Sequence, residues 1–167
     1  YVPWHYPFVW IAVSTPIIYS LFFLIASFKI IFSLLKNFLE INPDDFSKKL
    51  WKNYNEKVDF FILAFFLGPI IAVIIFQSNL FNGWRHLYFI YPGLIYLAVY
   101  AINYLMNFNV NKILKNIFFL IVFLSIILNI SNLIKFHPFQ NTYFNYLVEK
   151  KANTLFEVDY WGLGNAF

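Results

Sequence analysis

Four long apolar runs separated by short polar segments constrain the fold of this chain more than any other feature of its sequence. They cover residues 8–35, 60–77, 87–106 and 117–134, with boundaries good to a few positions. A helix needs about 20 apolar residues to cross the ~30 Å hydrocarbon core of a bilayer, because it rises only about 1.5 Å per residue. The runs therefore predict an all-α integral membrane protein with four transmembrane helices.

Composition supports the same class of protein. Hydrophobic residues make up 61% of the chain and charged residues 12%, whereas soluble domains average about 45–50% and about 25%. Positions that face lipid must be apolar, so charge is confined to the loops and tail. The chain has no cysteine, which excludes disulfides and thiolate metal sites. We expect membrane lipid as a partner and no nucleic acid.

The distribution of lysine and arginine predicts an orientation. Segment 36–58 and the loop 107–116 carry seven of these residues, and the opposite side carries four. By the positive-inside rule the lysine-rich side is cytoplasmic. Residues 1–135 then form the transmembrane region of a protein of the cell inner (plasma) membrane. Residues 136–167 form an extracytoplasmic tail, and both termini lie outside.

A further helix is predicted at about 43–57, lying in the interface on the cytoplasmic side. Asn42 and Pro43 resemble an N-cap followed by proline at the first helical position, and the aromatic or apolar residues then share one face: Phe46, Leu50, Trp51 and Tyr54. This pattern is typical of an amphipathic helix in the membrane plane. A solvated connector whose aromatic residues touch the helices is the alternative.

Several residues inside the runs are unusual for a lipid environment. We expect kinks at Pro16 and Pro69, while Pro92 belongs to the first turns of its helix. Three asparagines are expected to bond to neighbouring helices: Asn103, Asn129 and Asn132. No charged pair lies in the middle of a run, which counts against ion pumps and proton-coupled transporters.

Polar aromatic segments all fall on the predicted outer side, together with the three histidines and the single arginine. Arg85 begins a span, where its planar, permanently charged group suits a phosphate or carboxylate. His86 could add a second donor. The alternative is an interfacial anchor, in which Arg85 contacts headgroups within an aromatic belt that includes Trp84 and Tyr88.

Other candidate residues are less distinctive. His5, Tyr6, Trp84 and Asp159 are candidates for the lining of a pocket. The histidines, at 5, 86 and 137, match no local metal-ligand spacing, so a divalent metal has no support. Neither a glycine-rich phosphate loop nor a nucleophile elbow is present. We therefore assign no catalytic residue.

Four stretches in fixed order resemble the C-terminal part of bacterial glycosyltransferases of the GT-C superfamily, the polyprenyl-phosphate-dependent enzymes related to protein O-mannosyltransferases and aminoarabinose transferases. They are WHYPFVWIAVSTP at 4–16, NGWRHLYFIYP at 82–92, HPFQNTYFN at 137–145 and FEVDYWGL at 156–163. The resemblance implies a fragment of a larger multi-span fold. It also implies transfer of a sugar from a lipid-linked polyprenyl phosphate to an acceptor at the extracytoplasmic face, the glycan, lipid or protein nature of the acceptor being open.

The resemblance also implies roles for particular residues. Arg85 and His86 would lie near the carrier phosphate, and His5 near the same pocket. Members of the superfamily carry an acidic catalytic residue in a first outer loop, for which this chain has no equivalent, so the fragment is expected to be inactive alone. A transporter subunit, a non-catalytic membrane scaffold and a different GT-C branch such as an oligosaccharide ligase are the alternatives.

Overall fold

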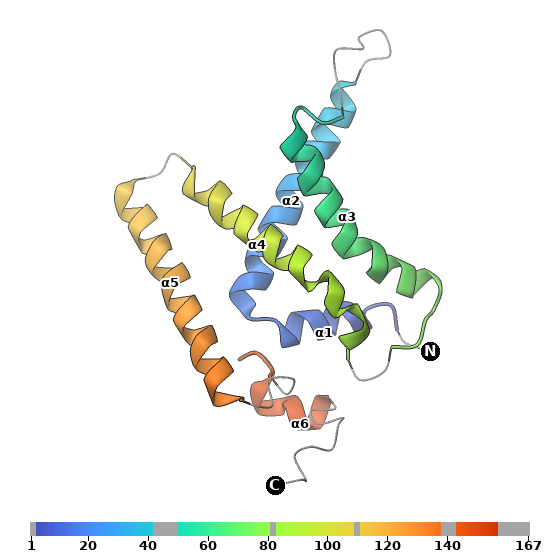
Figure 1. Ribbon diagram of the computed structural model, residues 1–167, viewed down its shortest axis with the longest axis vertical. Helices are drawn as coiled ribbons and strands as arrows, with labels where there is room; N and C mark the ends of the chain where they lie inside the picture. The colour runs from blue at the N-terminus through green and yellow to red at the C-terminus, as the bar shows by residue number, and fades with distance from the viewer. Residues whose placement is uncertain (1–2, 42–49, 81–82, 109–110, 138–142, 157–167) are drawn as a thin grey trace.

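The computed structural model describes residues 3–41, 50–80, 83–108, 111–137 and 143–156, and every regular element among them is helical (Figure 1). In chain order the elements are α1 (Tyr6–Ser14), α2 (Ile17–Glu40), α3 (Tyr54–Ile75), the 3-10 helix η1 (Arg85–Ile90), α4 (Tyr91–Met106), α5 (Lys112–Lys135), the 3-10 helix η3 (Glu149–Lys151) and α6 (Ala152–Leu155). The predicted all-α class is confirmed for these residues.

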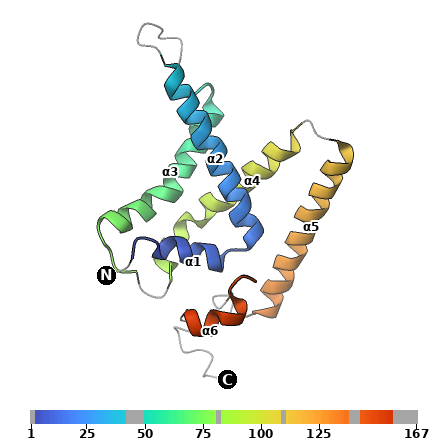
Figure 2. The ribbon, with the colours of Figure 1, turned by 180° about the vertical axis from the view of Figure 1, so that it is seen from behind.

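Four helical segments are long and apolar enough to cross a membrane, as the sequence predicts. They are Ile17–Glu40, Tyr54–Ile75, the continuous η1 and α4 at Arg85–Met106, and Lys112–Lys135. Figures 1 and 2 show that consecutive segments run in opposite directions. Their length, composition and alternation are those of a multi-pass membrane protein.

The first apolar run contains two helices rather than one. Pro16 has no backbone N–H, and a proline disfavours helical geometry at the residue before it. Thr15 is accordingly extended, with φ −104° and ψ 140°, and α1 ends at Ser14. The chain is therefore broken at Pro16, where the sequence predicts a kink, and the candidate span is Ile17–Glu40 instead of 8–35.

The second span begins earlier than the apolar run suggests. The Asn53 side chain accepts a hydrogen bond of 2.8 Å from the Glu56 backbone N–H and so caps α3. The helix therefore includes Glu56 and Asp59, which the sequence places before the span. It continues through Pro69 without interruption.

The predicted interfacial helix at 43–57 can be compared with the structure only over residues 50–57, because residues 42–49 lie outside the described residues. Residues 50–53 are not helical, and residues 54–57 form the first turn of α3. For its described part, this segment is the lead-in to a span.

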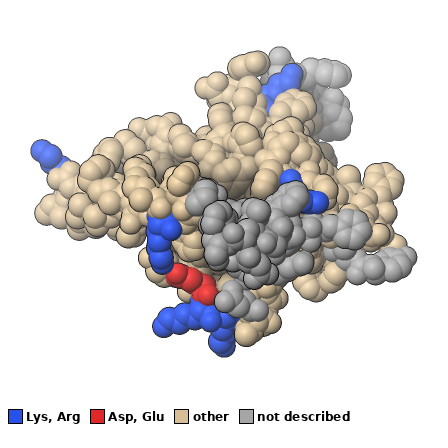
Figure 3. All heavy atoms as spheres, turned by 60° about the horizontal axis from the view of Figure 1, so that its bottom comes forward, with Lys and Arg blue, Asp and Glu red and all other residues tan. Residues whose placement is uncertain are grey.

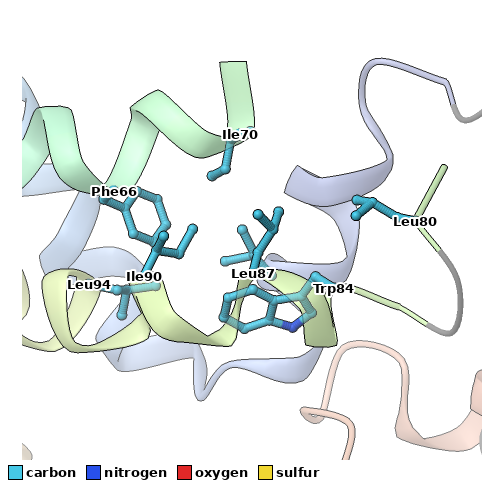
Figure 4. Close-up of a cluster of buried hydrophobic side chains, with 8 residues drawn as sticks. Phe66, Ile70, Leu80, Trp84, Leu87, Ile90 and Leu94 are labelled. Carbon is cyan, nitrogen blue, oxygen red and sulfur yellow. The ribbon is translucent and has the colours of Figure 1, made fainter. Parts of the chain in front are cut away.

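Helices α2, α3 and α4 pack together and form the core. One buried cluster lies where α1, η1 and the start of α4 meet α3, and it includes Phe66, Ile70, Trp84 and Leu94 (Figure 4). A second cluster joins α2 to the later part of α4 through small residues: Ala26, Ala98 and Ala101. Small side chains let membrane helices approach closely. Helix α5 has no buried residue.

Candidate functional site

The segment before η1 is seated on α1 through a glycine. Gly83 has φ +75°, in the left-handed region that residues with a Cβ disfavour. Its backbone N–H donates to the Tyr6 hydroxyl at 3.1 Å. A Cβ at this position would lie only 3.1 Å from the Trp10 ring. Glycine is therefore required here, and it joins the second polar aromatic segment to the first.

Trp84 continues this contact between η1 and α1. Its side chain is only 3% exposed, and its indole N–H donates to Ser14 Oγ at 2.7 Å. Its ring packs against Tyr88 at a centroid distance of 5.0 Å and against Tyr91 at 5.8 Å. Trp84 is thus a buried packing residue rather than a member of an exposed aromatic belt.

Asn145 fixes the described tail to the end of α1. It is 1% exposed, and its Nδ2 donates to the Ala12 carbonyl at 2.6 Å and to the Thr15 carbonyl at 2.9 Å. Its backbone N–H donates to the Val13 carbonyl at 2.9 Å. The last carbonyls of a helix have no partner within it, so this one side chain satisfies part of the C-terminus of α1.

Aromatic contacts complete the join between the tail and α1. The Trp10 ring lies 5.8 Å from that of Phe144 and 5.1 Å from that of Phe156. The described parts of three of the four stretches noted in the sequence, those at 4–16, 82–92 and 137–145, are therefore assembled at one end of the helices. The fourth, at 156–163, lies outside the described residues except for Phe156.

A cavity of about 230 Å³ opens beside this assembly, between α1, α2, α4, α5 and the tail. Its lining residues are Ser14, Pro16, Tyr19, Tyr91, Asn129, Asn132, Leu133, Phe136 and Tyr143. A second cavity of about 330 Å³ shares Pro16, Asn129, Asn132 and Tyr143 with it. The second cavity continues between α2 and α5 as far as Ile121. Together they form a trough that is apolar along most of its length and polar at one end.

The polar end of the trough offers hydrogen-bond donors. The Asn129 amide nitrogen is buried and has no hydrogen-bond partner among the described residues. Burial raises the pKa of the Tyr143 phenol, and the nearby Tyr146 and Glu149 raise it further, so this hydroxyl stays protonated at neutral pH. The Asn129 amide nitrogen does not make the predicted bond to a neighbouring helix. The Asn103 side-chain oxygen accepts at 3.4 Å from Asn107, which lies at the C-cap of the same helix.

Among the residues singled out from the sequence, Asn129 and Asn132 line the trough, whereas the phosphate-binding and pocket candidates do not. Arg85 is half-buried at the start of η1, and His86 is exposed. His5 is exposed at the N-cap of α1 and meets the Trp4 ring edge to face at 5.5 Å. Tyr6 is engaged with Gly83, and Asp159 lies outside the described residues.

Charged residues are few at the end of the helices where α1, η1 and the tail meet. Figure 3 shows a largely uncharged described surface there, with basic and acidic groups side by side near one edge. An exposed ion pair joins Lys135 to Glu149 at 3.4 Å. Within the described ranges, no three or more His, Asp or Glu side chains are grouped as metal ligands.

Sequence reasoning missed two kinds of residue. Ser14, Tyr19 and Tyr91 line the trough but look like ordinary residues within or beside an apolar run. Asp59 lies inside α3 and is 6% exposed; the asparagine cap before it was the available signal. This carboxylate lies in the second turn of α3 and not in the middle of the span, so the argument against ion pumps from the absence of a mid-span charged pair is unchanged.

An apolar trough with amide and phenol donors at one end suits an amphiphile whose polar head lies near the membrane surface and whose tail lies between helices. The chemistry offered by the described residues is binding and orientation. Comparisons with protein-family models, with curated proteins and with solved structures find no match to this chain.

Proposed function

We propose that this chain supplies the carrier-lipid site of a membrane glycosyltransferase that moves a sugar from a polyprenyl phosphate to an acceptor at the extracytoplasmic face of the plasma membrane. The observation that carries the proposal is the trough between α2 and α5, which ends in polar donors where the stretches that resemble GT-C enzymes are assembled. In this proposal the Lys135 end of α5 is extracytoplasmic, as are both termini.

The length of the trough suits an isoprenoid chain. Ile121, at its far end, lies fourteen residues along α5 from Lys135. At about 1.5 Å per residue this is roughly 21 Å, or about two thirds of the hydrocarbon core. A hydrocarbon tail could therefore run between the helices while its phosphate stays near the membrane surface.

Arg85 and His86 are the proposed partners of that phosphate. The leaving group in sugar transfer is an anion, and fixed cationic donors stabilise the charge that develops on it. Arg85 follows Trp84, whose indole is bonded to Ser14 in the lining of the trough. The general base that acts on the acceptor hydroxyl is not assigned to a residue of this chain, so the proposal is tested through binding of the donor.

Binding of undecaprenyl phosphate to the purified chain in detergent tests the proposal. Leu128 and Leu120 are both exposed leucines of α5, and only Leu128 lines the trough. We expect Leu128→Trp to weaken binding at least about 10-fold by filling the trough, and Leu120→Trp to leave it unchanged. Arg85→Ala should weaken binding of the phosphate by a similar factor, with little effect on undecaprenol, which lacks the phosphate.

Two results would contradict the proposal. Equal effects of Leu128→Trp and Leu120→Trp would show that the trough is not the site. Displacement of undecaprenyl phosphate by an equal concentration of phosphatidylglycerol would identify an ordinary lipid contact, which fits a non-catalytic membrane scaffold. Thermal unfolding of each variant shows whether it retains its fold.

A further inference from the structure

A small polar cavity lies at the opposite end of the helices, between α2, α3 and α4. Its volume is about 30 Å³, and its lining includes Asp59 of α3 and Asn37 of α2. Asp59 is 6% exposed, and the Tyr96 hydroxyl donates to its Oδ1 at 2.9 Å. No ion pair joins Asp59 to any residue that the structure describes. A carboxylate without an ionic partner is unusual in a candidate membrane span.

The buried carboxylate requires a neutralising partner. An isolated charge removed from water is strongly disfavoured unless it is paired, and one hydrogen bond from a neutral phenol does not replace a counter-ion. Three partners are chemically available: a proton on Asp59, the Lys29 ammonium in the lining of the same cavity, or a cation bound in the cavity. The other residues of the cavity decide between them.

Asn37 points to an occupant of the cavity. It is 4% exposed, and its Nδ2 donates to the Leu50 carbonyl at 3.1 Å and to Glu56 Oε2 at 3.3 Å. Because both donor contacts fix the amide, its Oδ1 is directed elsewhere, and this buried oxygen has no hydrogen-bond partner. A cation or a water in the cavity would give this oxygen a partner, and only a cation would at the same time neutralise Asp59.

The charges around the cavity favour a single positive charge. The ionisable residues that line the cavity are Glu56 and Asp59 from α3, Lys29 from α2 and Tyr100 from α4. The Tyr96 phenol of α4 is hydrogen-bonded to Asp59. The Lys29 ammonium lies 4.9 Å above the Tyr104 ring and forms no described ion pair with either carboxylate. With Asp59, Glu56 and Lys29 all ionised, the described residues that line the cavity carry a net charge of −1. A monovalent cation cancels this charge, and a divalent cation exceeds it.

We propose that this cavity binds one monovalent metal cation, of the size of Na⁺ or K⁺, through the side-chain oxygens of Asp59, Glu56, Asn37 and Ser33. Oxygen ligands suit such hard cations. A water needs about 10–15 Å³ of comparable space, so 30 Å³ holds one ion with one water. The buried Trp51 indole N–H, which also lacks a partner, is available to that water. This site does not depend on the glycosyltransferase proposal.

Ion identity provides the first test, on the unmodified chain in detergent at neutral pH and constant ionic strength. Its midpoint of thermal unfolding is measured in NaCl, KCl and choline chloride, because choline is too large for the cavity. Ligands that bind only the folded state raise this midpoint. We expect an increase of at least about 5 °C in Na⁺ or K⁺ over choline. The same midpoint in all three salts would overturn the proposal.

Variants locate the effect. Asp59→Asn should abolish the difference between the metal salts and choline, and Asn37→Ala should reduce it. Glu40→Gln is the matched control, because Glu40 is an exposed carboxylate on the same helix as Asn37 and its ion pair among the described residues is with Lys36. This variant should keep the full difference.

If Asp59→Asn does not fold, equilibrium binding of radioactive Na⁺ and K⁺ to the unmodified chain replaces it. A stoichiometry near one for either ion supports the site. Absence of binding, with a midpoint that rises on acidification equally in all three salts, would show a protonated Asp59 and refute the cation.

Discussion

Helices α4 and α5 are both candidate spans, and they relate to the rest of the molecule in opposite ways. The window of α4 is the least hydrophobic of the four and the most buried. It contacts both α2 and α3. The window of α5 is much more hydrophobic, yet none of its residues is buried. Figures 1 and 2 show α5 standing apart from the other three spans at its Lys112 end.

This difference reflects the solvent. In water, the more apolar helix would occupy the core, because burial is the main gain from apolar surface. In lipid, apolar side chains gain little from burial, and close packing of helices depends on small residues and shape. Helix α4 supplies these at Gly93, Ala98 and Ala101, all buried, and α5 contains neither glycine nor alanine. Helix α5 is therefore built to contact lipid or a ligand.

The largest expected effect compares one leucine from each helix. Leu97 of α4 is fully buried, whereas Leu120 of α5 is 55% exposed. Leu97→Ala leaves a cavity in the α2–α4 contact and should lower the free energy of unfolding by about 2–4 kcal/mol. Leu120→Ala removes only lipid or detergent contact and should change it by less than about 0.5 kcal/mol. Reversible unfolding in mixed micelles measures both.

Similar losses in the two variants would break the comparison between the helices. They would show that α5 is packed in the assembled protein as tightly as α4. The test depends on the free energy of unfolding of Leu120→Ala. The loss of stability in Leu97→Ala is expected regardless of what α5 contacts.

A smaller effect concerns how the chain after α5 is tied to α1. Asn145→Ala removes both Nδ2 hydrogen bonds to the end of α1 and leaves buried carbonyls without donors, which costs about 1–3 kcal/mol. Hydrogen exchange should increase at 143–149 and at the Lys135 end of α5, with α4 unchanged. Asn107→Ala is the control, since Asn107 is exposed and its side-chain hydrogen bond to Asn103 is long, at 3.4 Å. Equal exchange in the two variants would mean that Asn145 does not hold the tail.

The sequence predicts the helical class and the four spans because long apolar runs have one physical meaning in a chain of this composition. It fails at the ends of helices, where single residues decide. Thr15 and Pro16 turn one predicted span into α1 and α2, and the Asn53 cap moves the start of α3 to include Asp59. Hydrophobicity averaged over a window does not register such local hydrogen bonding.

The candidate site was only partly predictable for a related reason. The order of the polar aromatic stretches indicates that they share one side of the membrane, and the described parts of three are assembled there. Which residues line the trough depends on how α5 lies against α2, and periodicity does not show that. Asn145 closes the assembly through contacts with residues 130 or more positions away, and a long-range contact of this kind leaves no local pattern.

The smallest expected effect is at the ion pair between the end of α5 and η3. Lys135 Nζ lies 3.4 Å from Glu149 Oε1, with the two side chains 65% and 39% exposed. Exposed pairs gain little, because water and salt screen them and two long side chains must be ordered. A double-mutant cycle with Lys135→Ala and Glu149→Ala should therefore give a coupling below about 0.5 kcal/mol, lower still at high salt. A larger, salt-independent coupling would place this pair in an environment that excludes water, and α5 would then be joined to the tail as firmly as α4 is joined to α2.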